Sequence, residues 1–156
     1  MKHRLLRSIK LPLIFLVAFI PRFISWIYPG IGWRRLMIYD VQLYTDCGRA
    51  MIEAVLESNI EKFASINAGV PPLGTFLVGL SALTFRAWLD VYRAGLLAPI
   101  IASSASAPLI YLILHKRSEK AGLVAALVFS LDPYLVQFSS AYLDAIGAFF
   151  QLVAMF

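Results

Sequence analysis

The chain has 156 residues, of which 60% are hydrophobic and 15% are charged, and its formal net charge is +5. Because soluble domains carry about 25% charged residues, this composition excludes an ordinary water-soluble domain and predicts an integral membrane protein. The basic residues lie in small groups beside apolar segments, which favours cytoplasmic loops over a nucleic-acid-binding surface. Cys47 is the single cysteine, and no His/Cys group has metal-ligand spacing, so we expect no internal disulfide, metal or cofactor.

The first apolar segment, residues 11–28, follows a strongly basic N-terminus. A basic start and an apolar segment are also features of a secretory signal peptide. This segment is longer than a usual signal-peptide core and no clean small-x-small cleavage motif follows it. We therefore favour an uncleaved first span, interrupted by Pro21 and Arg22, with its N-terminus in the cytoplasm.

A long external loop, about residues 29–90, is expected next. Trp33, Arg34 and Arg35 form an aromatic and basic group typical of a membrane interface. Residues 39–63 then have apolar side chains at helical spacing with acidic and basic residues between them, which predicts a helix on the membrane surface.

The apolar segment 73–85 is too short for a usual span, whereas residues 91–114 are long enough to cross a membrane. A basic group follows at residues 115–120. This group and the basic N-terminus can both be cytoplasmic only if an even number of spans separates them. We therefore predict that 73–85 is a re-entrant or interfacial helix on the external side.

Two further spans are predicted at about 121–137 and 140–156. The predicted fold is a single all-α membrane domain over residues 1–156. It is a polytopic bundle of about four spans, at 11–28, 91–114, 121–137 and 140–156, whose first external loop carries juxtamembrane helices. Its expected location is the cell membrane.

The first candidate site comprises Asp40, Tyr44 and Asp46. Asp40 and Tyr44 are four residues apart and would share one helix face. A carboxylate at the membrane surface could act as a general base. It could equally be a helix N-cap, where aspartate complements the helix dipole.

Three other features can be read as structural or as functional. Val70-Pro71-Pro72-Leu73-Gly74 fits a plain helix start after a turn. Arg22 and Arg93, near the outer ends of two spans, could bind a lipid phosphate or snorkel to the headgroups. Asp144, which opens the fourth span after Asp132-Pro133, could be a functional carboxylate or a helix cap.

The order of these features resembles the N-terminal part of the GT-C glycosyltransferases, in particular protein O-mannosyltransferases and aminoarabinose transferases. Their proposed catalytic base is an acidic residue on the first external loop, a position that Asp40 matches best and Asp46 second. A Pro-Pro-Leu motif in the same loop corresponds to Pro71 and Pro72 here. An arginine that opens the next span corresponds to Arg93, and a Leu-Asp-Ala motif corresponds to 143–145, with Asp144 at its centre.

The resemblance covers nearly the whole chain but only the beginning of the family. The histidine that often precedes Pro-Pro-Leu is Val70 here, and the arginine that often precedes Leu-Asp-Ala falls at Ser139 or Ser140. Each difference could weaken substrate or phosphate binding. Family members also carry many more spans and usually a C-terminal soluble domain.

The chemistry that this resemblance implies is sugar transfer from a polyprenyl phosphate, held in the bilayer, to an external hydroxyl with inversion. Asp40 would accept the hydroxyl proton, and Arg93 would stabilise the departing phosphate. Tyr44, Pro71, Pro72 and Asp144 would contribute to substrate binding. The implied partners are the polyprenyl-phosphate sugar, membrane lipid, and further membrane helices or a partner chain, with no nucleic acid.

Two other functions remain open at this stage. The chain could be a small non-enzymatic scaffold or assembly subunit, in which Asp40 and the Pro-Pro-Leu segment are structural. It could also be part of a transporter in which Arg22, Arg93 and Asp144 line a path. Because the sequence ends at Phe156 within an apolar segment, we expect a fragment or one part of a split enzyme that is inactive alone.

Overall fold

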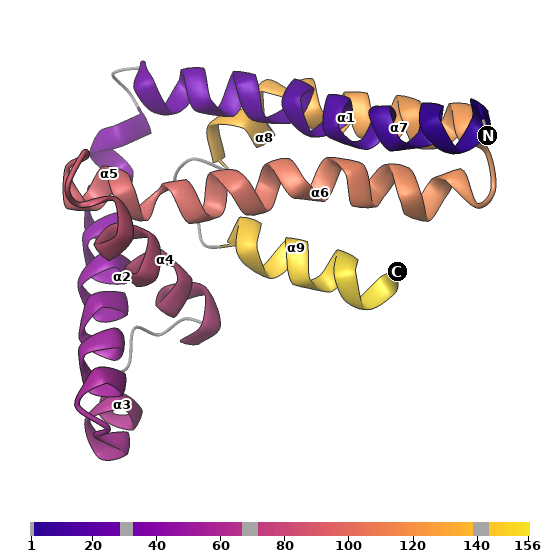
Figure 1. Cartoon of the computed structure of the whole chain (residues 1–156). Coiled ribbons are helices and arrows are strands. Elements are labelled where there is room, and N and C mark those ends of the chain that lie inside the picture. Colours follow the sequence, from indigo (N-terminus) through magenta and orange to yellow (C-terminus); the bar gives the residue numbers. More distant parts are fainter. Residues whose placement is uncertain (1, 29–32, 67–71, 139–143) are drawn as a thin grey trace.

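The computed structural model describes residues 2–28, 33–66, 72–138 and 144–156, which are helical with no strand among them. The prediction of an all-α fold is confirmed. Figure 1 shows the helices, whose bounds are α1 (Lys2–Ile27), α2 (Trp33–Leu56), α3 (Ile60–Ser65), α4 (Pro72–Phe85), α5 (Val91–Gly95), α6 (Leu97–His115), α7 (Glu119–Leu131), α8 (Pro133–Phe138) and α9 (Asp144–Met155).

Two segments, Ile9–Ile27 and Val91–His115, are long and apolar enough to cross a membrane, judged by length and composition alone. The structure thus gives two such segments where the sequence predicted four. The third predicted span, 121–137, is divided into α7 and α8, and α9 has 12 described residues. Helices this short fall below the roughly 20 residues that a bilayer core requires.

Asp132-Pro133 divides the third predicted span. Pro133 has no backbone N–H, so α7 cannot continue through it with a complete hydrogen-bond ladder. The Asp132 side chain instead accepts a hydrogen bond from the Leu135 backbone N–H at 2.9 Å and starts α8. A motif that the sequence placed near the outer end of a span therefore ends one helix and begins another.

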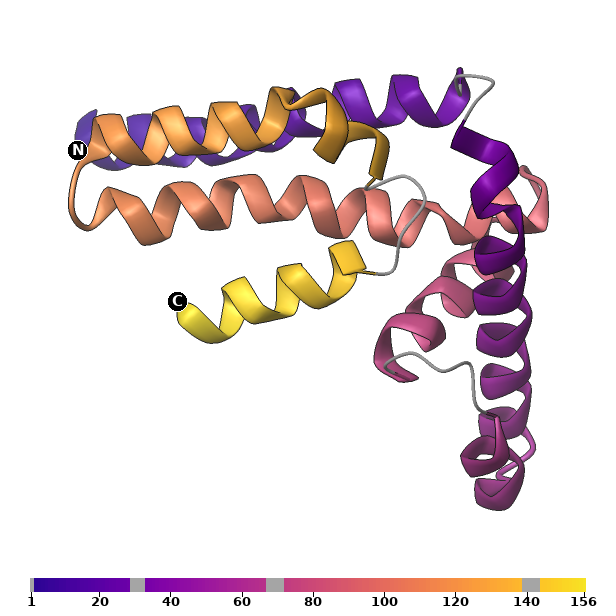
Figure 2. The same ribbon diagram turned by 180° about the vertical axis from the view of Figure 1, so that it is seen from behind.

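The helices run in two directions. We call α1, α6 and α7, which lie side by side in Figures 1 and 2, the long-helix layer, and α2, α3 and α4, which run across its direction, the transverse layer. The N-terminus and the α6–α7 turn lie at one end of the long-helix layer. The transverse layer and α5 lie at the other end, with α5 between α4 and α6 in the chain.

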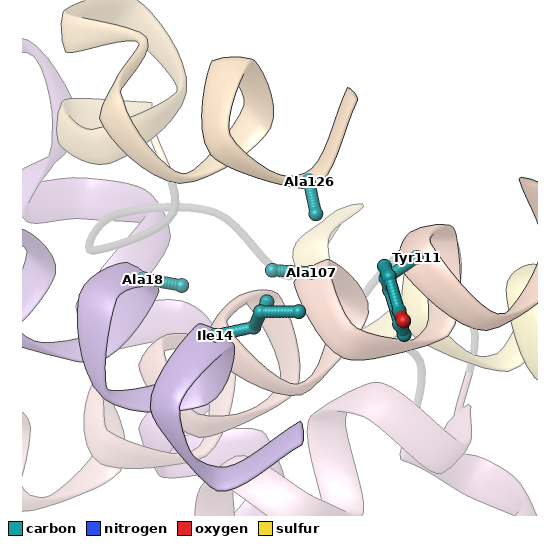
Figure 3. Close-up of a cluster of buried hydrophobic side chains, with 5 residues drawn as sticks. All are labelled: Ile14, Ala18, Ala107, Tyr111 and Ala126. Atoms are coloured by element: carbon teal, nitrogen blue, oxygen red, sulfur yellow. The ribbon is translucent and has the colours of Figure 1, made fainter. Parts of the chain in front are cut away.

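Small side chains bring the long helices together. The buried cluster comprises Ile14 and Ala18 of α1, Ala107 and Tyr111 of α6, and Ala126 of α7 (Figure 3). Gly122 of α7 packs against the backbone of α6, because a Cβ atom there would lie 2.9 Å from the Tyr111 carbonyl oxygen. The alanines and Gly122 allow the helix backbones to approach closely, and Ile14 and Tyr111 fill the space beside them.

The surface helix predicted over 39–63 differs from the structure at both ends. Helix α2 already begins at Trp33 and ends at Leu56, and α3 is a separate helix. Ser58 between them has φ 54°, a left-handed conformation that ends α2. The Asn59 side chain then accepts a hydrogen bond from the Lys62 backbone N–H at 2.8 Å and caps α3.

The predicted span 91–114 is also two helices, α5 and α6, which join at Leu96. Pro99 lies in the first turn of α6, where its missing N–H leaves the Gly95 carbonyl without the usual i+4 donor. The Leu96 backbone N–H bonds to the Tyr92 carbonyl at 3.2 Å, so the chain changes helix within one turn. Arg93, which the sequence placed near the outer end of this span, therefore lies on the short helix α5.

Helices α2 and α4 cross with their backbones in contact. Gly48 and Gly79 face each other at the crossing, and a Cβ atom on Gly48 would lie 2.7 Å from the Gly79 nitrogen. A Cβ on Gly79 would lie 2.6 Å from the Arg49 nitrogen. Each position therefore requires glycine, and α4 is held against α2 in the transverse layer.

Candidate functional site

Asp40 lies inside α2, seven residues after the helix begins at Trp33. Its interpretation as a helix N-cap is therefore wrong, because its own backbone is helical. Asp40 and Tyr44 are both half-buried, and their spacing of four places them on one face of α2, as the sequence predicted. Asp40 is therefore a half-buried carboxylate within α2 and not a helix cap.

Tyr44 packs into a cluster that joins four helices. The cluster contains buried Val78 of α4 and Ile146 of α9, with Tyr44 of α2 and with Ala98 and Ala102 of α6 packed against it. Helix α4 contacts α2, α6 and α9, so the cluster links helices far apart in sequence near the start of α6. The cluster therefore joins the face of α2 that carries Asp40 to the first turn of α9.

Asp144 is the first described residue of α9, two positions before buried Ile146. The cluster that fixes Ile146 therefore brings the start of α9 to the same region as Tyr44. The sequence separated Asp144 from Asp40 by more than 100 residues. Tertiary packing places the first turn of α9 in the hydrophobic cluster against which Tyr44 of α2 also packs.

The Arg93 side chain is exposed on α5, and three hydrogen bonds fix the backbone of Arg93 and Ala94. Its N–H donates to Asp90 Oδ1 at 3.2 Å, and its carbonyl accepts a hydrogen bond from Trp26 Nε1 of α1 at 3.3 Å. The next carbonyl, that of Ala94, accepts a hydrogen bond from Ser81 of α4 at 2.7 Å. An exposed guanidinium thus stands on a fixed backbone where α1, α4 and α5 meet.

Asp46 is exposed and stands apart from Asp40. Six helical positions turn the chain by about 240°, so the two carboxylates project from different sides of α2. Beside it, Cys47 is half-buried; burial, and to a smaller extent the charge of Asp46, raises the pKa of the Cys47 thiol. The structure therefore does not bring Asp46 to the side of α2 on which Tyr44 packs.

The Pro-Pro-Leu segment is only partly described. Pro72 is exposed and is the first residue of α4, as a plain helix start requires. Val70 and Pro71 lie outside the described residues. Thr75, in the first turn of α4, is fully buried, and its hydroxyl has no hydrogen-bond partner within the described parts of the chain.

Arg22 is fully buried, which contradicts the prediction that it snorkels to the headgroups or binds an external phosphate. Its Nε donates to Ser103 Oγ at 2.9 Å, and Nη1 donates to the carbonyls of Ala18 at 2.9 Å and Ser130 at 3.0 Å. Nη2 donates to the Phe129 carbonyl at 3.1 Å, and the guanidinium lies 5.1 Å from the Phe129 ring centroid. Arg22 joins α1 to both α6 and α7.

The role of Arg22 follows from Pro133. In an uninterrupted helix the N–H of residue 133 would bond to the Phe129 carbonyl, but proline has none. Arg22 supplies donors to the Phe129 and Ser130 carbonyls at this helix end. The sequence holds the signal, a proline that releases carbonyls in an apolar helix, but it does not show which distant donor satisfies them.

The described residues contain no group of three or more His, Cys, Asp or Glu side chains that could hold a metal ion. No family model, curated protein sequence or solved structure matches this chain. The candidate site therefore stands on its own geometry. It comprises the Asp40–Tyr44 face of α2, exposed Arg93 on α5 and the start of α9 at Asp144.

Proposed function

We propose that the chain is a membrane-embedded part of a glycosyltransferase that uses a sugar carried on polyprenyl phosphate. The observation that carries this proposal is the hydrophobic cluster that includes Tyr44 of α2 and Ile146 of α9, near the start of α6, where α5 also contacts α2. The proposal assigns the lipid-borne phosphate and the external acceptor to this part of the molecule, with half-buried Asp40 on α2 and exposed Arg93 on α5.

The exposed faces of the long-helix layer support placement in a bilayer. One face of α1 carries exposed aliphatic side chains over the 19 residues from Ile9 to Ile27, a length of roughly 27 Å, close to the roughly 30 Å hydrocarbon core. Its members are Ile9, Leu13, Leu16, Ile20, Ile24 and Ile27. Helix α7 also carries exposed aliphatic residues, at Leu123, Val124, Leu127, Val128 and Leu131.

The charge distribution supports a cytoplasmic N-terminus and a multi-pass topology in the cell membrane. Lys10 of α1 pairs with Glu119 of α7 at the end that carries the N-terminus, and Lys116, Arg117 and Lys120 are exposed at the same end. Positive residues are retained on the cytoplasmic side. The transverse layer, which carries Asp40, and the adjoining helix α5, which carries Arg93, then lie at the external surface.

In this proposal the acceptor hydroxyl oxygen attacks the anomeric carbon of the donor sugar from the face opposite the phosphate. Asp40 accepts the hydroxyl proton while the bond between the anomeric carbon and the phosphate oxygen breaks. The polyprenyl phosphate leaves with the bonding electron pair, and the Arg93 guanidinium stabilises its charge. Tyr44 and the Pro72 and Asp144 helix starts border the sugar and the acceptor.

The test measures transfer of a radiolabelled sugar from polyprenyl phosphate to endogenous acceptors, in membranes that contain the native gene product at its natural length. Asp40→Asn removes the proton acceptor with little change in shape, and we expect transfer to fall by about 100-fold or more. Asp46→Asn is the matched variant on the other side of the same helix and should retain transfer. Unchanged transfer in Asp40→Asn, or loss in Asp46→Asn alone, would overturn the assignment of the base.

A further inference from the structure

Two buried polar atoms lack hydrogen-bond partners where α2 and α4 cross. They are Nε of Arg49 on α2 and the hydroxyl oxygen of Thr75 on α4, and neither has a partner within the described parts of the chain. Thr75 is fully buried, and Arg49 as a whole is half-buried. Helices α2 and α4 lie side by side in both views (Figures 1 and 2). Because buried polar atoms are nearly always paired in folded proteins, this pair requires an explanation.

The glycine contact places Arg49 and Thr75 at the same crossing. A Cβ atom on Gly79 would lie 2.6 Å from the Arg49 backbone nitrogen. A Cβ atom on Gly48 would collide with the Thr75 carbonyl oxygen. Thr75 and Gly79 are four residues apart, so both lie on the face of α4 that packs against α2. The Thr75 hydroxyl and the Arg49 guanidinium therefore extend from backbone positions beside one contact.

Three buried serines show what Thr75 lacks. Ser104, Ser106 and Ser130 each donate a hydrogen bond to the carbonyl four residues earlier, at 2.7, 3.0 and 2.6 Å. Thr75 lies in the first turn of α4, so no preceding turn of that helix offers such a carbonyl. Thr45 of α2 is also buried without a partner, but its hydroxyl packs closely against α5. The Thr75 hydroxyl is thus available to a ligand at the beginning of α4.

Arg49 has no carboxylate that neutralises it among the described residues. Asp46 and Glu53 are three and four residues from Arg49 on α2, a spacing that would allow an ion pair. Both are exposed, and the described chain forms no ion pair between Arg49 and either of them. A guanidinium with a buried and unpaired donor is unfavourable, so a negative partner is favoured at this position.

We propose that Arg49, the Thr75 hydroxyl and the first turn of α4 bind a phosphate group. The first backbone N–H groups of a helix have no acceptor within it, and the positive end of the helix dipole favours an anion. A guanidinium donates to two phosphate oxygens together, and the hydroxyl and backbone N–H groups donate to the others. A neutral ligand would leave the charge of Arg49 uncompensated. Neither Asp40 nor Arg93 belongs to this site, so it does not rest on the proposed sugar transfer.

Equilibrium dialysis tests the site directly. The native gene product at its natural length, purified in mild detergent micelles, is dialysed at constant ionic strength against radiolabelled inorganic phosphate or against a short-chain phosphatidic acid. We expect saturable binding. Binding of inorganic phosphate identifies a free phosphate as sufficient, whereas binding of the phosphatidic acid alone identifies a lipid headgroup. Saturable binding of neither compound overturns the proposal.

Three variants connect the binding to this crossing. Arg49→Gln removes the charge and should weaken binding by about tenfold or more. Thr75→Val removes one hydroxyl and should weaken it by about threefold or more. Arg86→Gln is the matched control, because it makes the same change in net charge at an exposed arginine just after α4. Equal losses in Arg49→Gln and Arg86→Gln would show a general effect of charge and overturn the site.

The thermal stability of Thr75→Val without phosphate separates binding from folding. Valine has nearly the shape of threonine and leaves no unsatisfied hydroxyl, so this variant should have a Tm equal to or above that of wild type. A lower Tm in phosphate-free buffer would show that the hydroxyl is paired in the folded protein, and it would overturn the assignment of Thr75.

Discussion

The long-helix layer and the transverse layer hold their helices together by different means. In the long-helix layer, α1 and α7 meet through alanines and through Arg22, whose side chain reaches carbonyls of a helix more than 100 residues away. In the transverse layer, α2 and α4 meet backbone to backbone at Gly48 and Gly79. We call the hydrogen bonds of Arg22 to α6 and α7 the side-chain lock. The Arg22 side chain can adjust by rotation, whereas the backbone contact of Gly48 with Gly79 leaves no space for one added carbon atom.

The two layers also differ in polar satisfaction. The buried guanidinium of Arg22 has hydrogen-bond partners on Nε and on both terminal nitrogens. In the transverse layer the hydroxyls of Thr45 and Thr75 are fully buried and have none within the described residues. The contact between α2 and α4 therefore depends on fit, and the contact between α1 and α7 depends on hydrogen bonds.

The largest expected effect is at the backbone contact. Gly79→Leu places a side chain against the α2 backbone near Gly48 and Arg49, so the helices must separate. We expect the free energy of unfolding to fall by about 3 kcal/mol or more. Titration of the purified protein with SDS in mild detergent micelles measures it. Gly147→Ala is the control, since open space surrounds that position, and an equal loss in both variants would refute the difference.

The next largest effect is at the side-chain lock. Arg22→Met keeps the length of the side chain but removes the donors to the Phe129 and Ser130 carbonyls at the end of α7, where Pro133 has no N–H to bond to Phe129. We expect a loss of about 2 kcal/mol in the same titration. Hydrogen exchange should increase at the end of α7 and in α8 more than in α2.

Two companion variants sharpen this result. Arg22→Lys keeps the charge but lacks the planar fork that reaches Ser103 and both carbonyls together, so it should lie between wild type and Arg22→Met. Ser103→Ala removes a single partner and should cost less than Arg22→Met. If Arg22→Met were as stable as wild type, the Phe129 and Ser130 carbonyls would have other donors, and the stabilising role of Arg22 would be disproved.

The smallest expected effect is on the thiol of Cys47. Burial and the Asp46 charge raise its pKa, so the reactive thiolate is scarcer at neutral pH than in a free cysteine. Labelling by a membrane-impermeant maleimide should therefore accelerate at higher pH than for a free thiol. Asp46→Asn should move this acceleration slightly toward lower pH, because the charge is the smaller of the two causes.

The same reaction tests the topology. With the transverse layer external, Cys47 should be labelled on intact cells, and labelling only after lysis would overturn that placement. For the pH dependence of labelling, Glu53→Gln is the matched control to Asp46→Asn, because Glu53 on α2 does not contribute to the raised pKa of Cys47. A shift of equal size in that variant would show that general charge, and not neighbouring Asp46, acts on the thiol.

Apolar length and spacing were sufficient to predict the helices themselves. The all-α class, the apolar segments near 11–28 and 91–114, and the shared face of Asp40 and Tyr44 all follow from side-chain periodicity. The helix boundaries followed less well. Hydrophobic spacing did not reveal that α2 begins at Trp33, because its first residues are basic and aromatic and were read as a membrane interface.

The breaks inside apolar segments depended on single residues whose effects are local but ambiguous. Pro99 and Pro133 both lie in apolar segments, and a proline can kink a helix, end it or occupy its first turn. Pro99 and Pro133 each lie in the first turn of a new helix, α6 and α8. The sequence alone did not decide between these outcomes, so it predicted longer spans than the described residues form.

What the sequence by itself determined is which segments are helical, which are apolar, and which charges lie near their ends, since these properties depend on neighbours within a few positions. Only the tertiary structure decided that Arg22 is buried against α7 and that Tyr44 packs against the cluster that contains Ile146 of α9. Each of these depends on contacts between residues far apart in the chain. Helical spacing fixes the face that a side chain occupies, but the packing of the helices fixes what that face meets.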